Sequence, residues 1–234
     1  MSFEMDASPL SDLAPVSRDS LQHQAKQAIV RSILNGLFMP GERVVETKVA
    51  EGLNLSRSTV RAALQTLIQE GLLEQESFRG TIVMPVTVRG AEELETIRES
   101  LEQLAVRQAI VHASDAEVAE LRARYERALA AAANQDVGLA YHLDLAMHQQ
   151  IVAMAHHSLL SRHFALIEHK MLLYMAHAGG PHLSAEGFRR QHEDVMEGIA
   201  NRDEARALKG LDRHFVEATS FLVGMFTNKE TTHD

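Results

Sequence analysis

Four side chains in the C-terminal half of the sequence are of the types that bind transition metals. Asp144 and His148 stand four positions apart in YHLDLAMHQQI, so on a helix both project from one face. His192 and His214 lie in two later segments, RRQHEDVMEGI and GLDRHFVEA. If these segments are helices of one bundle, one carboxylate and three imidazoles can converge on a divalent ion such as Zn²⁺, Ni²⁺, Mn²⁺ or Fe²⁺. The alternative for an Asp/His pair at this spacing is a surface hydrogen bond.

A second group of side chains has chemistry suited to DNA. The stretch LSRSTVRAAL holds Arg57 and Arg61 four positions apart, hence on one helical face. Its hydroxyl residues are Ser56, Ser58 and Thr59. Arginine can bond guanine through O6 and N7, and short hydroxyls suit phosphate oxygens or base edges. Further along, Arg79 and Gly80 occupy a predicted turn from which Arg79 could reach a minor groove or a phosphate. The alternative is an ordinary surface helix with scattered arginines.

A third pair, Arg98 and Glu102, is again spaced by four in LETIRESLEQLA. The simpler interpretation is a local salt bridge that stabilises the helix by roughly a few tenths of a kcal/mol. In the functional interpretation, Arg98 points into the bundle and clamps a carboxylate, which a guanidinium binds through two parallel hydrogen bonds. Tyr141 is a weaker candidate for the same cavity. These three residues are the predicted effector-binding set.

The remaining histidines of the C-terminal half do not show this convergence. We expect His142, two positions before Asp144, to face away from it. The others lie near helix ends or at positions typical of a surface, and we expect them to be solvent-facing or in loops: His156, His157, His163, His169, His177 and His182.

The DNA-type residues lie within elements that are typical of a winged helix-turn-helix. Apolar residues at helical spacing predict a helix from residue 18 that Gly36 ends, and LFMPGERV is a turn. A short helix over 46–53 precedes NLS, and Ser56 is a plausible N-cap of a third helix that runs to about Glu70. The segment LLEQESFRGTIVMPV predicts two short strands around Arg79 and Gly80. We therefore predict a DNA-binding domain over residues 18–86.

From Thr87 the pattern is helical throughout, which predicts a mainly α protein. Six amphipathic segments separated by short loops indicate an antiparallel six-helix bundle over residues 87–228, with a tail at 229–234. The second segment opens with Ser114 and Glu117 in capping-box spacing. Asp136 is expected to begin the third helix and Ser184 the fifth. Asn201 and Asp203 precede a sixth that is expected to run to about residue 226.

Composition agrees with two parts of different chemistry. The chain has 234 residues, a formal net charge of −9 and no cysteine, which excludes disulfides and thiolate metal sites. Residues 18–85 hold 8 basic and 7 acidic side chains, whereas residues 86–234 hold 15 and 22. Residues 1–17 are polar, hold two prolines and are expected to form a disordered arm. With no signal peptide or membrane-length apolar stretch, we expect a cytoplasmic protein.

The N-terminal half resembles a known family. ILNGLFMPGERVVETKVAEGLNLSRSTVRAALQTLIQEGLLEQESFRGTIV is similar to the DNA-binding domain of the GntR family of bacterial transcription regulators. The resemblance assigns the hydroxyls and arginines of residues 56–61 as DNA contacts and places Arg79 and Gly80 in the wing. Thr59 and Ala62 stand where many members have Pro and Glu, and Thr47 stands where a DNA-contacting Arg is common. The resemblance therefore does not extend to a particular operator sequence.

The all-helical half then resembles the FCD ligand-binding domain of the FadR branch, in its smaller, VanR-like form. The D-x-x-x-H motif, QHEDVMEGI and RHF match the metal motif found in many members, which assigns Asp144, His148, His192 and His214 as ligands. Members often carry R-x-x-x-E near the effector cavity, as at Arg98 and Glu102. The resemblance implies a homodimer that binds a palindromic DNA operator, acts as a repressor and senses a small organic or sugar acid through its metal.

Two alternatives to this function remain open from the sequence. The metal itself could be the signal, with no organic effector. A metal with open positions could also activate water in a helical-bundle metalloenzyme. The sequence lacks H-E-x-x-H, paired E-x-x-H, G-x-S-x-G and a glycine-rich nucleotide loop, so we expect a regulator and no catalytic residues.

Overall fold

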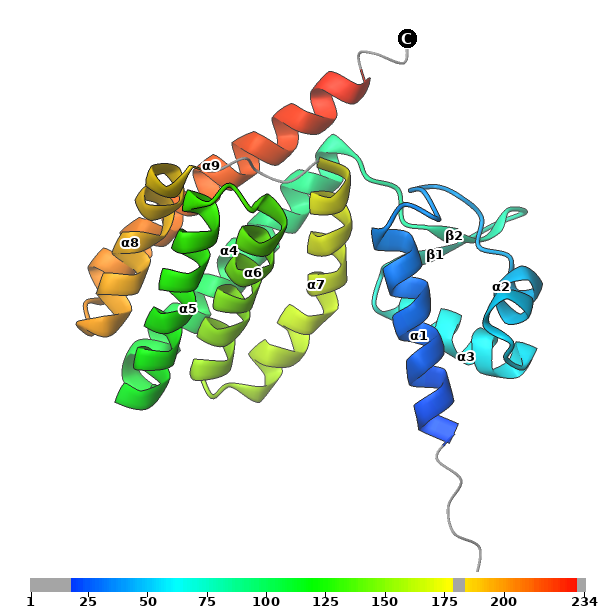
Figure 1. Cartoon of the computed structure of the whole chain (residues 1–234), viewed down its shortest axis with the longest axis horizontal. Coiled ribbons are helices and arrows are strands. Elements are labelled where there is room, and N and C mark those ends of the chain that lie inside the picture. Colours follow the sequence, from blue (N-terminus) through cyan, green and yellow to red (C-terminus); the bar gives the residue numbers. More distant parts are fainter. Residues whose placement is uncertain (1–17, 179–183, 231–234) are drawn as a thin grey trace, which may run out of the picture.

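The computed structural model describes residues 18–178 and 184–230, and it places two helical bodies side by side (Figure 1). The expected arm over residues 1–17, residues 179–183 with His182, and residues 231–234 of the expected tail lie outside the described residues.

The N-terminal body is the three-helix and hairpin arrangement that the sequence predicts. Its elements are α1 (Arg18–Leu34), α2 (Glu46–Leu53), α3 (Arg57–Gln69), β1 (Leu73–Glu76) and β2 (Gly80–Val83). The strands pair antiparallel, with Leu73 opposite Val83 and Glu76 opposite Gly80. Ile33, Leu67 and Val83 are fully buried, so the helices and the inner face of the hairpin share one core.

The turn between α2 and α3 is tight because of two residues. Asn54 adopts a left-handed conformation (φ 52°) that ends α2, and Asn tolerates this region better than most residues. Ser56 then caps α3, since its Oγ accepts a hydrogen bond from the backbone N–H of Thr59 at 3.1 Å. The first turn of α3, with Arg57 and Arg61, is thereby held at an exposed edge.

The C-terminal body is a bundle in which all described regular structure is helical. Its elements are α4 (Val88–His112), α5 (Asp115–Ala133), α6 (Val137–Met154), α7 (Ser158–Ala178), α8 (Ala185–Ala200) and α9 (Glu204–Glu230). The mainly α fold class is confirmed. The last helix is longer than predicted, because α9 continues through residues that the sequence assigned to the tail.

Local capping defines where several of these helices begin. Ser114 and Glu117 form a reciprocal capping box at α5, with Ser114 N–H donating to Glu117 Oε2 at 2.8 Å. Asp136 and Ser184 cap α6 and α8 through their side chains. Helices α4 to α9 lie alongside one another (Figure 1), and their buried apolar residues belong to one hydrophobic cluster. Among the helices that the structure describes, none combines the length and apolar composition that crossing a bilayer requires.

One helix, α7, joins the two bodies. Its His169 Nδ1 lies 3.3 Å from Glu70 Oε2 at the end of α3, and Lys26 of α1 pairs with the same carboxylate. Its Tyr174 hydroxyl accepts a hydrogen bond from the backbone N–H of Thr87, the residue between the bodies, at 3.2 Å. The expectation that His169 faces solvent is wrong, because the N-terminal domain covers that side of α7.

Candidate metal centre and DNA-binding surface

Three imidazoles meet inside the C-terminal domain. His148 on α6, His192 on α8 and His214 on α9 are buried, and one ring nitrogen of each lies within 4.8 Å of the others. Asp144, one turn before His148, places its Oδ1 2.9 Å from Nε2 of His192 and 3.7 Å from Nε2 of His148. The structure thus brings together the four residues that the sequence indicated as metal ligands.

The atoms that face one another in this cluster are buried yet lack hydrogen bonds within the described part of the chain. They are Oδ1 of Asp144, Nε2 of His148, Nε2 of His192 and both ring nitrogens of His214. Leaving a buried polar atom unsatisfied costs about 1–3 kcal/mol. A group of such atoms facing one another therefore indicates a binding site whose ligand would satisfy them. Nitrogen and oxygen ligands bind such an ion at about 2.0–2.2 Å, so two of them would stand roughly 3.0–3.5 Å apart, which is close to the Asp144–His192 separation of 2.9 Å. The donor set therefore fits a divalent ion.

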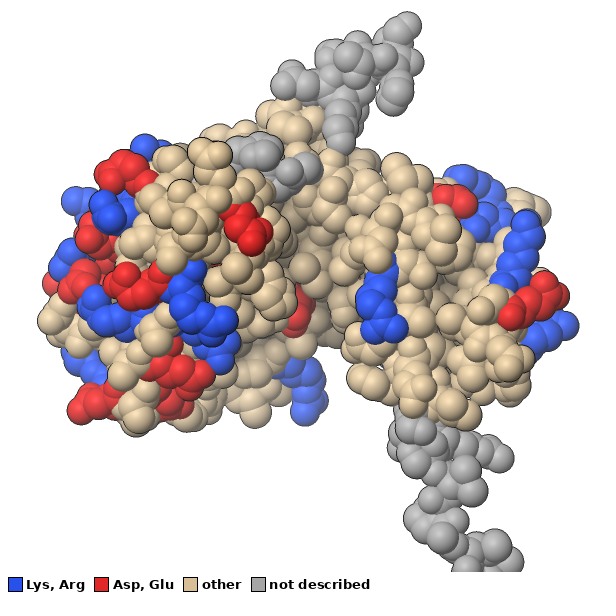
Figure 2. All heavy atoms as spheres, viewed as in Figure 1, with Lys and Arg blue, Asp and Glu red and all other residues tan. Residues whose placement is uncertain are grey.

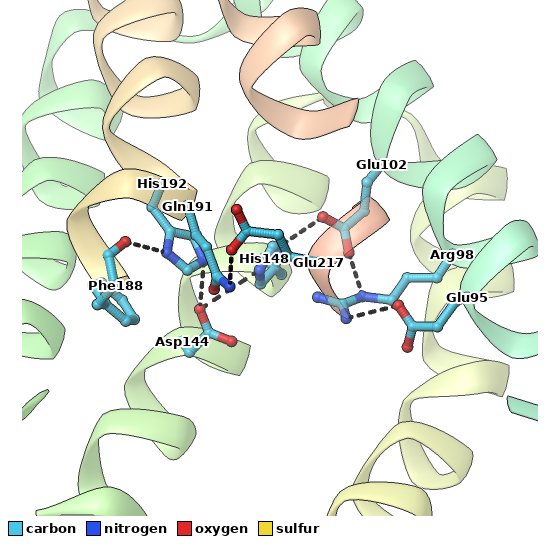
Figure 3. A network of polar contacts seen from close by, with 9 residues as sticks. All are labelled: Glu95, Arg98, Glu102, Asp144, His148, Phe188, Gln191, His192 and Glu217. Carbon is cyan, nitrogen blue, oxygen red and sulfur yellow. Dashed lines mark hydrogen bonds and ion pairs between the residues drawn. The ribbon is translucent and has the colours of Figure 1, made fainter. Parts of the chain in front are cut away.

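Two further groups orient the imidazoles. The carboxylate of Glu102 hydrogen-bonds Nδ1 of His148 from α4. The backbone carbonyl of Phe188 accepts a hydrogen bond from Nδ1 of His192 at 2.9 Å. Since a carbonyl oxygen can only accept, Nδ1 of His192 carries the proton and Nε2 is left as a ligand atom. Acceptors of this kind fix the tautomer and orientation of metal-binding histidines, and Figure 3 shows both contacts.

The electrostatics of the cluster follow from burial and neighbouring charge. Burial disfavours the imidazolium of His148, but the Glu102 carboxylate outweighs it and raises the pKa of His148 to about 9. Burial, with His192 and His148 nearby, holds the pKa of His214 well below its usual value. Burial opposes the charge of Asp144, yet the two adjacent imidazoles hold its pKa well below the usual range. A metal ion binding here would displace the proton of His148.

A cavity of about 100 Å³ lies beside this cluster. Its polar lining consists of Glu95, Arg98, Tyr141, Asp144, Gln191, His214 and Glu217. Its apolar lining consists of Leu145, Met171, Met175, Ala218, Phe221 and Leu222. A water needs about 10–15 Å³ of such space, so the cavity has room for a small organic molecule of several heavy atoms.

The predicted effector residues occupy different places in this cavity. Arg98 is buried, its Nε lies 2.7 Å from Glu102 Oε1, and its guanidinium stands 5.1 Å from the ring centre of Phe215. Tyr141 lines the cavity, and burial raises the pKa of its hydroxyl, so it remains a phenol that can donate. Glu102 is fully buried behind Arg98 and is not part of the cavity wall. It would act on a ligand only through Arg98 and His148.

The DNA-type side chains gather at the exposed edge of α3. Arg61 donates two hydrogen bonds to the carboxylate of Glu46 on α2, from Nε at 2.8 Å and from Nη2 at 2.9 Å. Arg57 Nε lies 3.4 Å from the same carboxylate. Both arginines remain more than half exposed, and basic side chains dominate the charged atoms at this outer end of the molecule in Figure 2. Glu46 therefore contacts both arginines and holds them beside the first residues of α3.

The wing presents Arg79 beside a strained tip. Arg79 donates to Glu76 Oε2 at 2.8 Å and to the backbone carbonyl of Gly41 at 3.0 Å. Gly80 has a φ of 81°, a conformation that favours glycine. Phe78 also has a positive φ (68°), and its side chain is fully exposed. The wing tip thus combines a cation with an aromatic ring.

Replacing Glu46 by glutamine is expected to raise the affinity for non-operator DNA several-fold. The ratio of operator affinity to non-operator affinity should therefore fall. The change removes a negative charge that competes with phosphate and loosens the orientation of Arg57 and Arg61. Fluorescence anisotropy with both DNA types at one salt concentration measures the effect. Glu51→Gln, on an exposed position of the same helix, is the matched control. Equal behaviour of the two variants would contradict a role for Glu46.

Several residues at these two sites were not indicated by the sequence. Glu46 meets Arg61 across a turn of α2 and α3, and local spacing gives no signal for such a pair. Glu95, Gln191 and Glu217 line the cavity but stand in charged segments that resemble solvent-facing helix surfaces. Only the position of Glu95 one turn before Arg98 could have indicated it.

Comparisons with known proteins identify a family for each of the two domains. Residues 21–83 match the bacterial regulatory proteins of the gntR family, and residues 93–217 match the FCD domain. The chain is 30% identical over 195 residues to the uncharacterized HTH-type transcriptional regulator YdhC of Bacillus subtilis, across 79% of this chain and 83% of that protein. It is 22% identical over 201 residues to the HTH-type transcriptional repressor RspR of Escherichia coli, across 84% and 86%.

The fold has solved counterparts as well. The structure of Escherichia coli McbR/YncC superposes with a TM-score of 0.73 at 22% identity, covering 89% of this chain and 98% of that one. A transcriptional regulator from Rhodococcus sp. RHA1 gives 0.72 at 22% identity, covering 88% and 98%. The matched domains and these relatives are regulators of transcription and not enzymes. With a gntR-type DNA-binding domain followed by an FCD domain, the chain belongs to the GntR family of bacterial transcription regulators.

Proposed function

We propose that this regulator is a repressor whose FCD domain holds a divalent metal ion and that a small carboxylic acid, bound beside it, releases the operator. The observation that carries the proposal is the set of buried, unsatisfied nitrogens of His148, His192 and His214. This cluster adjoins the cavity, because Asp144 and His214 line it together with Arg98. Zn²⁺ suits these ligands best among the candidate ions, with Ni²⁺, Mn²⁺ and Fe²⁺ as alternatives.

Different residues of the site would bind the metal ion and the acid. Asp144, His148, His192 and His214 would hold the ion, which when bound supplies a positive charge and open positions for a carboxylate oxygen. Arg98 offers a guanidinium from the opposite wall, and Glu102 keeps it in place. The apolar side chains of Met171 and Met175 exclude water from one side of the cavity. Together these groups favour a small anion over a neutral molecule.

Repression and dimerisation have separate support. RspR, which resembles this chain over most of its length, is named a repressor.

On α4, the exposed side chains of Ile97, Leu104 and Val111 repeat every seven residues and form one apolar stripe. A second copy of the chain can cover this stripe, and a two-fold dimer places two α3 helices for the half-sites of a palindrome.

Replacing Val111 by glutamate is expected to shift the protein from dimer to monomer, since the change buries a charge in an apolar contact. Sedimentation velocity over a range of protein concentrations measures the shift. Leu159→Glu, at an exposed leucine of α7, serves as the control and should leave the dimer intact. A Val111 variant that stays dimeric would place the interface elsewhere.

Signal transfer is expected to depend on the fit of Tyr174 against Gly90 at the start of α4. A β-carbon on Gly90 would overlap the Tyr174 hydroxyl, which accepts the hydrogen bond of Thr87. Gly90→Ala should therefore shrink the effect of an acid on operator affinity, while metal binding stays unchanged. Gly224→Ala, at a helical glycine with open space around it, is the matched control. An unchanged response in Gly90→Ala would exclude this contact from the coupling.

The test of the proposed function is a thermal-shift screen of organic and sugar acids, run in parallel on Zn²⁺-loaded and chelator-stripped protein. An acid that raises the melting temperature only of the loaded protein, and that releases the protein's own promoter DNA, supports the proposal. Arg98→Ala and His192→Ala should both abolish the response. If free metal alone controls release over a physiological range and no acid matters, the metal is the signal and the carboxylate proposal fails.

A further inference from the structure

Glu95 stands out in the cavity because it is an acid at a site proposed to bind acids. Its side chain is only 3% exposed, and its Oε2 lacks a hydrogen bond among the described residues. Its nearest charged neighbour is Arg98, whose Nη1 lies 3.6 Å from that oxygen, too far for a hydrogen bond. Figure 3 shows Glu95 and Arg98 together on one side, facing Asp144 and His192 on the other.

This arrangement leaves the carboxylate of Glu95 short of donors. Arg98 already gives its Nε hydrogen to Glu102, so one guanidinium serves two carboxylates. Burial raises the pKa of the Glu95 carboxyl, and the Arg98 charge only partly opposes this. A buried acceptor in this position gains most from a hydrogen-bond donor that enters the cavity with the ligand.

A neighbouring cavity residue also offers a hydrogen-bond acceptor. Gln191 donates to Glu217 Oε2 at 2.8 Å, which turns the side-chain oxygen of Gln191 into a further possible acceptor. The Glu217 carboxylate itself is already paired, since Arg190 donates to both of its oxygens. An acid without a distal hydroxyl could reach the metal and Arg98 but would leave Oε2 of Glu95 unpaired. Such unpaired groups are how a binding site rejects an analogue that lacks a hydroxyl.

We infer that Glu95 is a specificity-determining residue that accepts a hydrogen bond from a hydroxyl of the effector distal to its metal-binding end. The effector class is then a short polyhydroxy acid. An ammonium donor is disfavoured because it would stand beside the guanidinium of Arg98. This inference rests on the proposed function, since it assumes that the acid binds between the metal site and Arg98.

The experiment compares matched acids that differ in a distal hydroxyl: lactate with glycerate, and 2-hydroxybutyrate with 2,4-dihydroxybutyrate. In each pair both members carry the 2-hydroxyl that could itself contact the metal, so only the distal hydroxyl varies. Calorimetric titration of the full-length, Zn²⁺-loaded protein gives the dissociation constants. We expect at least a tenfold preference for the hydroxylated member of one or both pairs.

Variants assign the preference to Glu95. Glu95→Leu should reduce it to less than threefold, while Glu95→Gln, which keeps an acceptor oxygen, should retain a several-fold preference. Glu92→Leu, at an exposed position of the same helix, should behave as wild type. Bound Zn²⁺ per chain, measured for every variant, shows whether each one is folded and loaded.

Two outcomes would overturn the inference, and only the second would also contradict the proposed function. If the acids bind in a metal-dependent and Arg98-dependent manner but both members of each pair bind equally, Glu95 does not set specificity and the proposed function stands. If no acid of the set binds the loaded wild-type protein, the carboxylate-sensing proposal fails together with the inference.

Discussion

Replacing His192 by alanine is expected to lower the affinity for Zn²⁺ by about a hundredfold or more, because residues that merely orient metal ligands already account for about 10- to 100-fold. His192 contributes an unsatisfied Nε2 beside Asp144, and its Nδ1 is already fixed by the carbonyl of Phe188. Competition with a chromophoric chelator measures the affinity. In the same protein, Zn²⁺ should no longer raise the melting temperature, and no acid should release operator DNA.

The controls separate metal binding from packing. His192 stacks on Phe188 with ring centres 4.3 Å apart, so alanine also leaves a cavity. His192→Gln keeps most of the volume and should lose metal affinity with a smaller loss of stability. His142→Ala, at an exposed histidine of α6, should bind Zn²⁺ as wild type does. Tight Zn²⁺ binding by both His192 variants would refute the metal centre.

The second large effect is expected at α3. Arg61→Ala should remove a base contact worth about 1–3 kcal/mol, and a two-fold dimer loses it twice. Operator affinity should therefore fall by about 30-fold to more than 10⁴-fold, while affinity for non-operator DNA changes far less. Arg57→Ala should act in the same direction. Because residues 18–85 carry nearly balanced charge, the domain has no broad basic field that could compensate for the loss.

A shift assay or anisotropy titration on the protein's own promoter, at one fixed salt concentration, measures this loss. Arg89→Ala is the control. Arg89 is an exposed arginine of α4 that pairs with Glu93 and lies outside the DNA-binding domain, so this variant should bind operator DNA as the wild type does. Operator affinity that survives both Arg57→Ala and Arg61→Ala would remove α3 from the role of recognition helix.

The sequence predicts those features that depend on neighbours along the chain. The capping box of Ser114 and Glu117 and the cap of Ser56 are local hydrogen bonds, and both occur where the spacing indicates. The pair Asp144 and His148 is also local. The convergence of His192 and His214 on this pair is assigned by the resemblance to the FCD domain and not by spacing alone, and the structure brings the three histidines together. The end of α9 is less determined, since no glycine or proline follows Phe226 to end the helix.

Features that depend on how elements pack could not be predicted. Glu46 and Arg61 meet because α2 crosses in front of α3, and His169 meets Glu70 because α7 packs against the N-terminal domain. Glu95 lies in the acidic segment EELETIRE, where one buried glutamate looks like its solvated neighbours. For each of these residues the chemistry is readable in the sequence, but its partner is known only from the tertiary structure.

The position of α7 has a thermodynamic consequence. One side of this helix gives Met171 and Met175 to the cavity, and other sides give His169 and Tyr174 to contacts with the N-terminal domain and Thr87. If an acid lowers operator affinity by some factor, operator DNA must lower affinity for that acid by the same factor. Copies bound to the promoter would then respond only at higher acid concentrations than free copies, so the amount of protein in the cell would itself help to set the induction threshold.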